Sequence, residues 1–165
     1  MRFMVLALLS VFLALPVAAE PPQVSLAVGP GFVAAARDSS GENEGVDTYV
    51  DVGVRLSGNV SVGLRDRQLP EDRSLHDVSL WGRFDLSDYT TSQVIPYTRL
   101  GFGHLILDMG GTAPDVSEAT WWLAGGIEMK QSDLFSFFSE AEGIWYQSSE
   151  HIDELGLRLG GLFRF

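Results

Sequence analysis

The sequence contains no cysteine, which excludes disulfide bonds and the lipid-modified cysteine of a lipoprotein. Basic residues are scarce: 11 Lys and Arg stand against 22 Asp and Glu, giving a formal net charge of −11 at pH 7. Such a chain offers no basic surface for nucleic acid, whose binding depends on neutralising phosphates. After Glu20 no apolar run approaches the roughly 18 residues of a membrane-spanning helix. A domain of many short strands, each ended by a turn, fits this composition and its 18 glycines.

The first 19 residues are typical of a secretory signal peptide. Arg2 supplies the positive charge, residues 4–15 (MVLALLSVFLAL) are apolar, and residues 16–19 (PVAA) offer small side chains for cleavage before Glu20. We therefore expect residues 1–19 to be removed on export. Residues 20–165 are expected to form a single domain outside the cytoplasm.

Alternation of apolar and polar residues dominates the rest of the chain. In residues 48–57 (TYVDVGVRLS) an aliphatic residue occupies every second position, and residues 60–67 repeat the pattern. Gly58-Asn59 between them is the kind of two-residue turn that closes a β-hairpin, because it tolerates positive φ. Period-two alternation is typical of strands that bury one face.

The same alternation predicts eight strands, at residues 23–36, 47–57, 60–68, 76–86, 93–106, 120–130, 134–146 and 154–165. The predicted connections alternate between longer ones (37–46, 69–75, 107–119, 147–153) and shorter ones (58–59, 87–92, 131–133). Long loops at one end and short turns at the other, with an even strand number, are the layout of bacterial outer-membrane barrels. The expected fold is therefore all-β: an eight-stranded antiparallel up-and-down transmembrane β-barrel in the cell outer membrane, with both termini on the periplasmic side.

Alternation does not say which face is wet, because a soluble barrel of the lipocalin kind has the same period with its apolar face inward. Here the charged face is also rich in glycine, and a narrow eight-stranded lumen accommodates long side chains only beside small ones. Charges of both signs share that face and can neutralise one another. We predict lipid outside and an interior salt-bridge network of Asp51, Arg55, Arg65, Arg83, Arg99, Glu128, Glu140, Glu142 and Arg158. Aromatic residues near strand ends are expected to form membrane girdles: Trp121, Trp145, Phe84, Phe135, Phe137, Phe163 and Phe165.

The last strand carries the most specific pattern. In residues 155–165 (LGLRLGGLFRF) one face carries Leu155, Leu157, Leu159, Phe163 and Phe165. This resembles the C-terminal β-signal by which outer-membrane barrels are recognised for insertion. With residues 96–103 (PYTRLGFG) and 122–128 (WLAGGIE), the chain resembles the OmpA/OmpX-like superfamily of small outer-membrane barrels. The resemblance implies contact with outer-membrane lipids and lipopolysaccharide, and insertion by the barrel-assembly machinery.

Carboxylates form two groups that could carry chemistry. Glu140 and Glu142, two apart on a strand, have Cα atoms roughly 6.5–7 Å apart and could act as acid and base, but ion pairing with interior arginines is the simpler role. The acidic first loop could bind divalent cations between lipopolysaccharide phosphates, although a solvated loop is the plainer interpretation. That loop comprises Asp38, Glu42, Glu44 and Asp47.

The three histidines, His76, His104 and His151, fall at the loop end of the predicted barrel without the spacing of metal ligands. Eight-stranded lipid A deacylases place a catalytic His and Ser two residues apart on the penultimate strand. The nearest segment here, residues 144–147 (IWYQ), has Trp and Gln in those places. We therefore expect no enzymatic activity, no metal and no cofactor.

Three functions remain open from the sequence. The first is a structural or surface-interaction role through the extracellular loops. The second is a lipid-modifying outer-membrane enzyme or a narrow channel. The third is a soluble periplasmic barrel that binds an apolar ligand, which would require the opposite orientation of the two faces.

Overall fold

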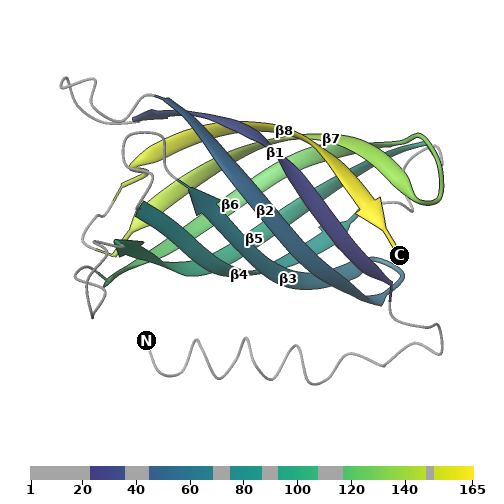
Figure 1. Cartoon of the computed structure of the whole chain (residues 1–165), viewed down its shortest axis with the longest axis horizontal. Helices are drawn as coiled ribbons and strands as arrows, with labels where there is room; N and C mark the ends of the chain where they lie inside the picture. The colour runs from purple at the N-terminus through teal and green to yellow at the C-terminus, as the bar shows by residue number, and fades with distance from the viewer. Residues whose placement is uncertain (1–22, 36–44, 69–74, 87–92, 108–116, 148–150) are drawn as a thin grey trace.

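The alternating segments form eight β-strands that close into one barrel in the computed structural model (Figure 1). The structure describes residues 23–35, 45–68, 75–86, 93–107, 117–147 and 151–165. Its strands are β1 (Val24–Ala35), β2 (Gly45–Ser57), β3 (Val60–Gln68), β4 (Leu75–Asp85), β5 (Val94–Leu107), β6 (Ser117–Lys130), β7 (Phe135–Tyr146) and β8 (Glu154–Arg164).

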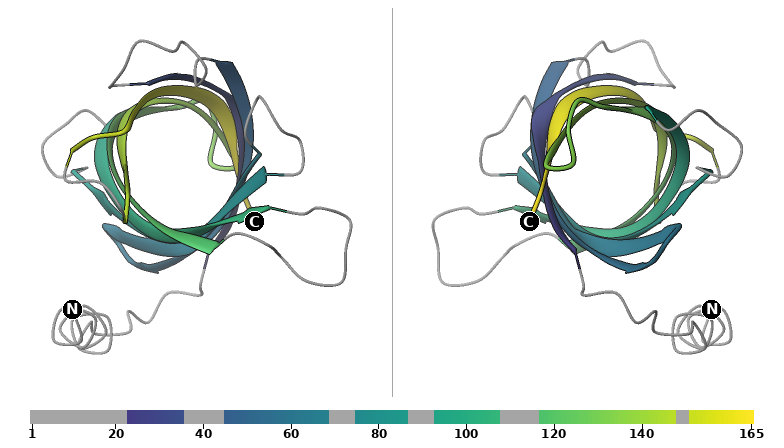
Figure 2. Two further views of the ribbon diagram at one scale, coloured as in Figure 1. Left: turned by 90° about the vertical axis from the view of Figure 1, so that its left-hand side faces the viewer. Right: turned by 90° about the vertical axis from the view of Figure 1, so that its right-hand side faces the viewer.

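Each strand pairs antiparallel with the next one in sequence, and β8 pairs with β1 to close the ring seen end-on in Figure 2. The expected eight-stranded up-and-down barrel is thus confirmed. We call the end where β1 begins and β8 ends the turn end, and the opposite end the loop end. Strands β2, β4 and β6 end at the turn end, where β3, β5 and β7 begin, and the opposite ends of these strands lie at the loop end (Figure 1).

The strand boundaries agree with the predicted ones to within three residues. The largest difference is at β6, which begins at Ser117 rather than at residue 120. Residues 117–119 carry no apolar alternation, yet they pair with residues 104–106 of β5 and extend the sheet. Backbone pairing therefore continues past the point where the side-chain pattern stops.

The β2–β3 hairpin turns at Gly58-Asn59, as predicted. The pairing register shifts between Arg55 and Ser57, which marks an irregularity just before the turn. The carbonyl of Asn59 accepts a hydrogen bond from the backbone N–H of Asp85 at 2.8 Å, and this ties the hairpin to β4.

The expected signal peptide (residues 1–19) and most of the expected loops lie outside the described residues. Asp47 is an exception and corrects the assignment of the acidic first loop: it belongs to β2, where it is fully buried. In the described ranges, no helix is long and apolar enough to cross a membrane.

The two faces of the sheet differ sharply in chemistry. Large apolar side chains, such as Val52, Leu64, Leu80 and Leu123, are exposed on the outer surface. Buried side chains point into the lumen and include Arg65, Asp51, Glu128 and Glu140. A soluble barrel has the reverse arrangement, because exposed apolar bands of this extent are unfavourable in water. The architecture is that of a transmembrane barrel.

Candidate functional site: the charged barrel interior

The centre of the lumen is filled by two arginines and their partners. Arg65 donates hydrogen bonds to Asp51 at 2.8 Å, to Glu140 at 2.7 Å and to Glu142 at 2.9 Å. Arg99 donates to Asp51 at 2.9 Å and lies 3.3 Å from Glu140. Five charged groups thus form one network in which every charge has an opposite neighbour, the condition under which buried charge is tolerated.

Two indole rings complete this central layer. The Arg65 guanidinium lies 4.1 Å from the Trp122 ring, and that of Arg99 lies 4.3 Å from the Trp81 ring. In such stacking the flat face of the guanidinium contacts the aromatic ring, while the N–H groups at its edge donate hydrogen bonds. Trp122 donates to Ser79 at 3.1 Å. The layer spans the lumen between the two ends of the barrel.

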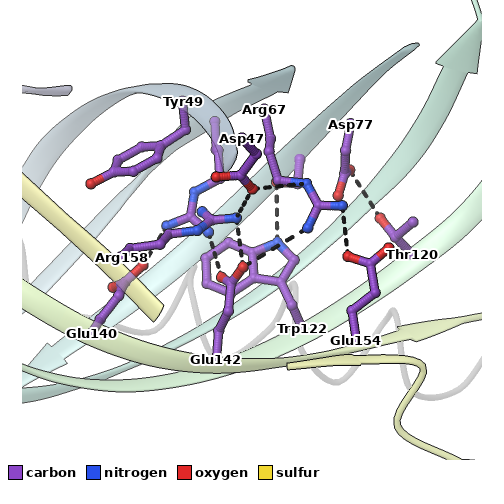
Figure 3. Close-up of polar contacts among 12 residues, drawn as sticks. Asp47, Tyr49, Arg67, Asp77, Thr120, Trp122, Glu140, Glu142, Glu154 and Arg158 are labelled. Atoms are coloured by element: carbon purple, nitrogen blue, oxygen red, sulfur yellow. Dashed lines mark hydrogen bonds and ion pairs between the residues drawn. The ribbon is translucent and has the colours of Figure 1, made fainter. Parts of the chain in front are cut away.

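Toward the loop end lies a second set of charges, drawn in Figure 3. Arg158 contacts Glu142 at 2.5 Å and Asp47 at 3.6 Å. Arg67 contacts Glu154 at 3.0 Å and Asp47 at 3.7 Å. Both oxygens of Asp47 lack a hydrogen-bond partner among the described residues, as do nitrogens of both arginines. Unpaired donors and acceptors therefore face one another here, and bridging water can satisfy both.

Asp77 and Tyr146 line the same loop-end region. Asp77 accepts a hydrogen bond from the Thr120 hydroxyl at 3.0 Å, and the Tyr146 hydroxyl donates to Glu154. Both carboxylates are buried, so these bonds replace part of the hydration that each carboxylate has in water.

Toward the turn end, the arginines alternate with carboxylates in a chain. Arg83 contacts Asp85 at 2.5 Å and Glu128 at 2.6 Å. Glu128 also pairs with Arg164, and Asp85 pairs with Arg55 at 3.3 Å. The Arg55 side chain is 28% exposed, which makes it the most accessible of these arginines. Beside this chain the lumen contains a cavity lined by polar and apolar side chains.

All nine residues expected in the interior network lie in the lumen and take part in these ion pairs. Six further charged residues of the interior were not included in the prediction: Asp47, Arg67, Asp77, Asp85, Glu154 and Arg164. The sequence pattern indicates these residues too, because each is separated by an even number of positions from a predicted interior residue on the same strand. Arg67, for example, follows Arg65 by two residues, and Asp85 follows Arg83 by two.

Lumenal glycines make room for charged side chains, as expected, and also for aromatic rings: a Cβ on Gly31 or Gly156 would meet Asp47 or Glu142, whereas other glycines face rings. A Cβ on Gly101 would lie 2.1 Å from the Trp122 ring, and one on Gly63 would lie 2.4 Å from the Trp81 ring. A Cβ on Gly126 would similarly collide with Tyr97. The rigid rings cannot yield as the ends of flexible chains can.

Gly101→Ala is therefore expected to lower the free energy of unfolding by about 1–3 kcal/mol, the usual cost of overpacking. Gly125→Ala is the matched control, because a Cβ at Gly125 meets no atom within 4 Å. It should change stability by less than about 0.5 kcal/mol. Urea unfolding in lipid vesicles measures both. Equal losses in the two variants would contradict the packing described for Trp122.

The outer face carries aromatic groups near both ends of the strands. Near the loop end, Trp121 packs on Phe102 with ring centroids 4.3 Å apart. Near the turn end, Phe135 packs on Phe137 at 4.8 Å and on Phe163 at 5.0 Å. The seven aromatics expected in girdles all lie outside the lumen, and Phe165 is the most exposed of them. Aromatic side chains at two levels are what membrane–water interfaces favour.

Two of the three histidines contact side chains of the outer face among the described residues. His76 pairs with Asp66 at 2.9 Å on the outer face. His104 packs edge-on against Phe102, and His151 is exposed. Among the described residues, no three His, Asp or Glu side chains are placed to hold a metal ion.

Comparison with solved structures supports the fold. The N-terminal β-barrel domain of Pseudomonas aeruginosa OprF superposes with a TM-score of 0.66 at 15% identity, over 87% of this chain and 97% of that one. A de novo designed transmembrane β-barrel gives 0.61 at 14% identity, over 88% and 98%. The Yersinia pestis attachment invasion locus protein Ail, solved with the heparin analogue sucrose octasulfate, gives 0.52 at 12% identity, over 88% and 100%. At these identities the likeness is one of fold. No protein-family model and no curated protein matches the sequence.

Proposed function

We propose that this chain is an outer-membrane barrel protein with a structural or surface-interaction role, exerted at the loop end, and that it is not an enzyme. The observation that supports a location in the outer membrane is the orientation of the two faces of the sheet. Valine, leucine and phenylalanine cover the outside, while ion pairs fill the inside. Small outer-membrane barrels of similar fold, such as OprF and Ail, support this location.

A narrow channel is a weaker candidate because of the central layer. Arg65, Arg99 and the two lumenal indoles fill the region that an ion would have to cross. Opening a path there would separate guanidinium groups from carboxylates that hold them at 2.7–2.9 Å. A soluble ligand-binding barrel is disfavoured by the apolar exterior.

The charge distribution favours binding to a negatively charged partner through cations at the cell surface. Seven arginines lie in lumenal ion pairs, which leaves Arg2, Arg37, Arg73 and Lys130 as the other cations of the sequence. Connections at the loop end are mainly acidic: Asp38, Glu42, Glu44, Glu71, Asp72, Asp108, Asp115 and Glu150. We propose that they contact lipopolysaccharide phosphates through divalent cations. A polyanion such as the heparin analogue bound by Ail is a poor match for this charge.

Trimming one connection tests where the role resides. Replacing residues 108–116 by a short turn should leave a heat-modifiable, outer-membrane-located barrel. In a strain from which the gene has been deleted, the trimmed protein should restore neither detergent resistance nor surface attachment. Both properties are measured with and without added Mg²⁺. The matched control trims residues 87–92 at the turn end and should restore both. Full complementation by both trimmed proteins would show that the role does not depend on residues 108–116.

We also propose that the outer face of β8 is the insertion signal read by the barrel-assembly machinery. Leu155, Leu157, Leu159, Phe163 and Phe165 all project from that face. The backbone of Phe165 is already paired, since its N–H donates to the carbonyl of Val24 at 2.9 Å. Its side chain is 75% exposed and contributes little to packing.

Deleting Phe165 is therefore expected to reduce insertion much more than stability. The truncated protein should accumulate in the periplasm in a protease-sensitive form, while the same protein refolded in detergent should unfold at nearly the same urea concentration as the full chain. Cell fractionation and urea titration measure the two effects. A normal outer-membrane yield would contradict the role assigned to this face.

A further inference from the structure

We propose that the lumen at the turn end is a binding pocket for a small oxyanion, a phosphate or a carboxylate. The pocket is the cavity beside the Arg83–Asp85 ion pair, which is lined by polar and apolar side chains and has a volume of about 40 Å³. This exceeds the roughly 10–15 Å³ that a single water molecule needs. Gln23, Arg55 and Ser61, which are partly exposed, stand near its mouth at the turn end. Trp81 and Arg99, which are buried, lie deeper.

The walls of the pocket present positive charge. Four arginines line it: Arg55, Arg83, Arg99 and Arg164. Asp51 is the one carboxylate among the described lining residues. The carboxylates that balance the other arginines, namely Asp85, Glu128 and Glu140, contact them without lining the cavity. An entering anion therefore meets guanidinium groups first.

Donors without partners point to the kind of ligand. Arg99 donates through Nη1 to Asp51, but its Nε and Nη2 have no hydrogen-bond partner among the described residues. The Trp81 indole N–H also lacks one in that part of the chain. Both side chains are only 5% exposed, and both line the cavity. Leaving such donors unpaired is costly, and only an acceptor can satisfy them.

The chemistry of these donors suits an oxyanion in particular. Nε and one Nη of a guanidinium form a fork that binds two oxygens of a carboxylate or phosphate. The Trp81 ring lies 4.3 Å from the Arg99 guanidinium, so its N–H can supply a third donor nearby. The loop-end region differs, because the unpaired atoms of Arg67 and Arg158 there face unpaired oxygens of Asp47 and Glu142. Water satisfies that mixture, whereas an anion would be repelled by the carboxylates.

Phosphate titration of the full chain in lipid nanodiscs tests the proposal. Indole ¹⁵N–¹H spectra resolve Trp81 from the other tryptophans, with Trp81→Phe providing the assignment. Inorganic phosphate, and acetate in a separate arm, are added at constant ionic strength against chloride. The Trp81 signal should shift saturably with at least one of the two, and the two arms distinguish a phosphate from a carboxylate site. Trp122, whose N–H is bonded to Ser79, should stay in place.

Two variants locate the site. Ser61→Asp adds a carboxylate at the mouth and should weaken binding at least about tenfold through like-charge repulsion. Arg55→Gln should weaken it several-fold, whereas Lys130→Gln, which removes a cation outside the cavity, should leave it unchanged. Each variant is first shown to be heat-modifiable. The proposal is overturned if neither anion gives a saturable Trp81 shift beyond that of chloride. Unaltered binding by Ser61→Asp would equally overturn it, because the anion would then bind elsewhere.

Discussion

Glu140→Leu is expected to lower the free energy of unfolding by about 3–5 kcal/mol, the cost of removing one partner of a buried ion pair. Glu140 is 1% exposed and accepts hydrogen bonds from Arg65 at 2.7 Å and from the Tyr97 hydroxyl at 3.1 Å. It also lies 3.3 Å from Arg99. Leucine would leave both arginines with one carboxylate fewer in a lumen that cannot hydrate them fully.

The neighbouring residue provides the control. Ala141→Leu changes an exposed position on the lipid side of the same strand, and its effect should stay within about 0.5 kcal/mol. Glu140→Gln keeps the shape and the acceptor oxygen, so its loss should fall between the other two. Urea unfolding in lipid vesicles measures all three. If Glu140→Leu and Ala141→Leu unfold at the same urea concentration, Glu140 is solvated and the central network does not hold the barrel together.

The second large effect is expected at Val52, in the middle of β2 and 48% exposed on the outer face. Val52→Arg would place a charge in the lipid and should cost roughly 2–4 kcal/mol. Val52→Leu should be almost neutral, because lipid deforms around an added methylene. A packed protein core would instead be strained by typically 1–3 kcal/mol.

The comparison of these two variants distinguishes a membrane barrel from a soluble one. Arginine would also destabilise a soluble barrel with Val52 in its core, so that result alone decides nothing. In vesicles, the refolding yield and the urea stability should be much lower for Val52→Arg than for Val52→Leu. Comparable losses for Val52→Arg and Val52→Leu would mean that protein, not lipid, surrounds this side chain.

The sequence predicts which side chains of a strand face the lumen, because successive residues point to opposite faces along the whole strand. Val52 and Asp51, or Leu100 and Arg99, alternate in sequence and lie on opposite faces in the structure. The same rule, applied to the strand ends, would have added Asp47 and Arg164 to the interior. Both residues lie inside the predicted strands, at residues 47–57 and 154–165, so the rule covers them.

The pairing of charges across the lumen could not be predicted in the same way. Arg65 of β3 meets Glu140 and Glu142 of β7, which are 75 and 77 residues away and not on a neighbouring strand. Which residues meet depends on the tilt and stagger of the strands, properties of the closed barrel that a local pattern does not contain. Parity places Trp81 on the face of Arg83 and Trp122 on the face of Glu128, but it does not give the arginines on which the two rings stack.

The four tryptophans allow the orientation of the barrel to be measured directly. Trp121 and Trp145 lie on the outer face, whereas Trp81 and Trp122 are buried in the lumen. Four proteins, each retaining one tryptophan with the others changed to Phe, are refolded into vesicles of phospholipids brominated along the upper acyl chain. Bromine quenches tryptophan fluorescence on contact. Trp121 and Trp145 should be strongly quenched, while Trp81 and Trp122 remain bright. Quenching of Trp81 and Trp122 with Trp121 and Trp145 unaffected would contradict a barrel with lipid outside and ion pairs within.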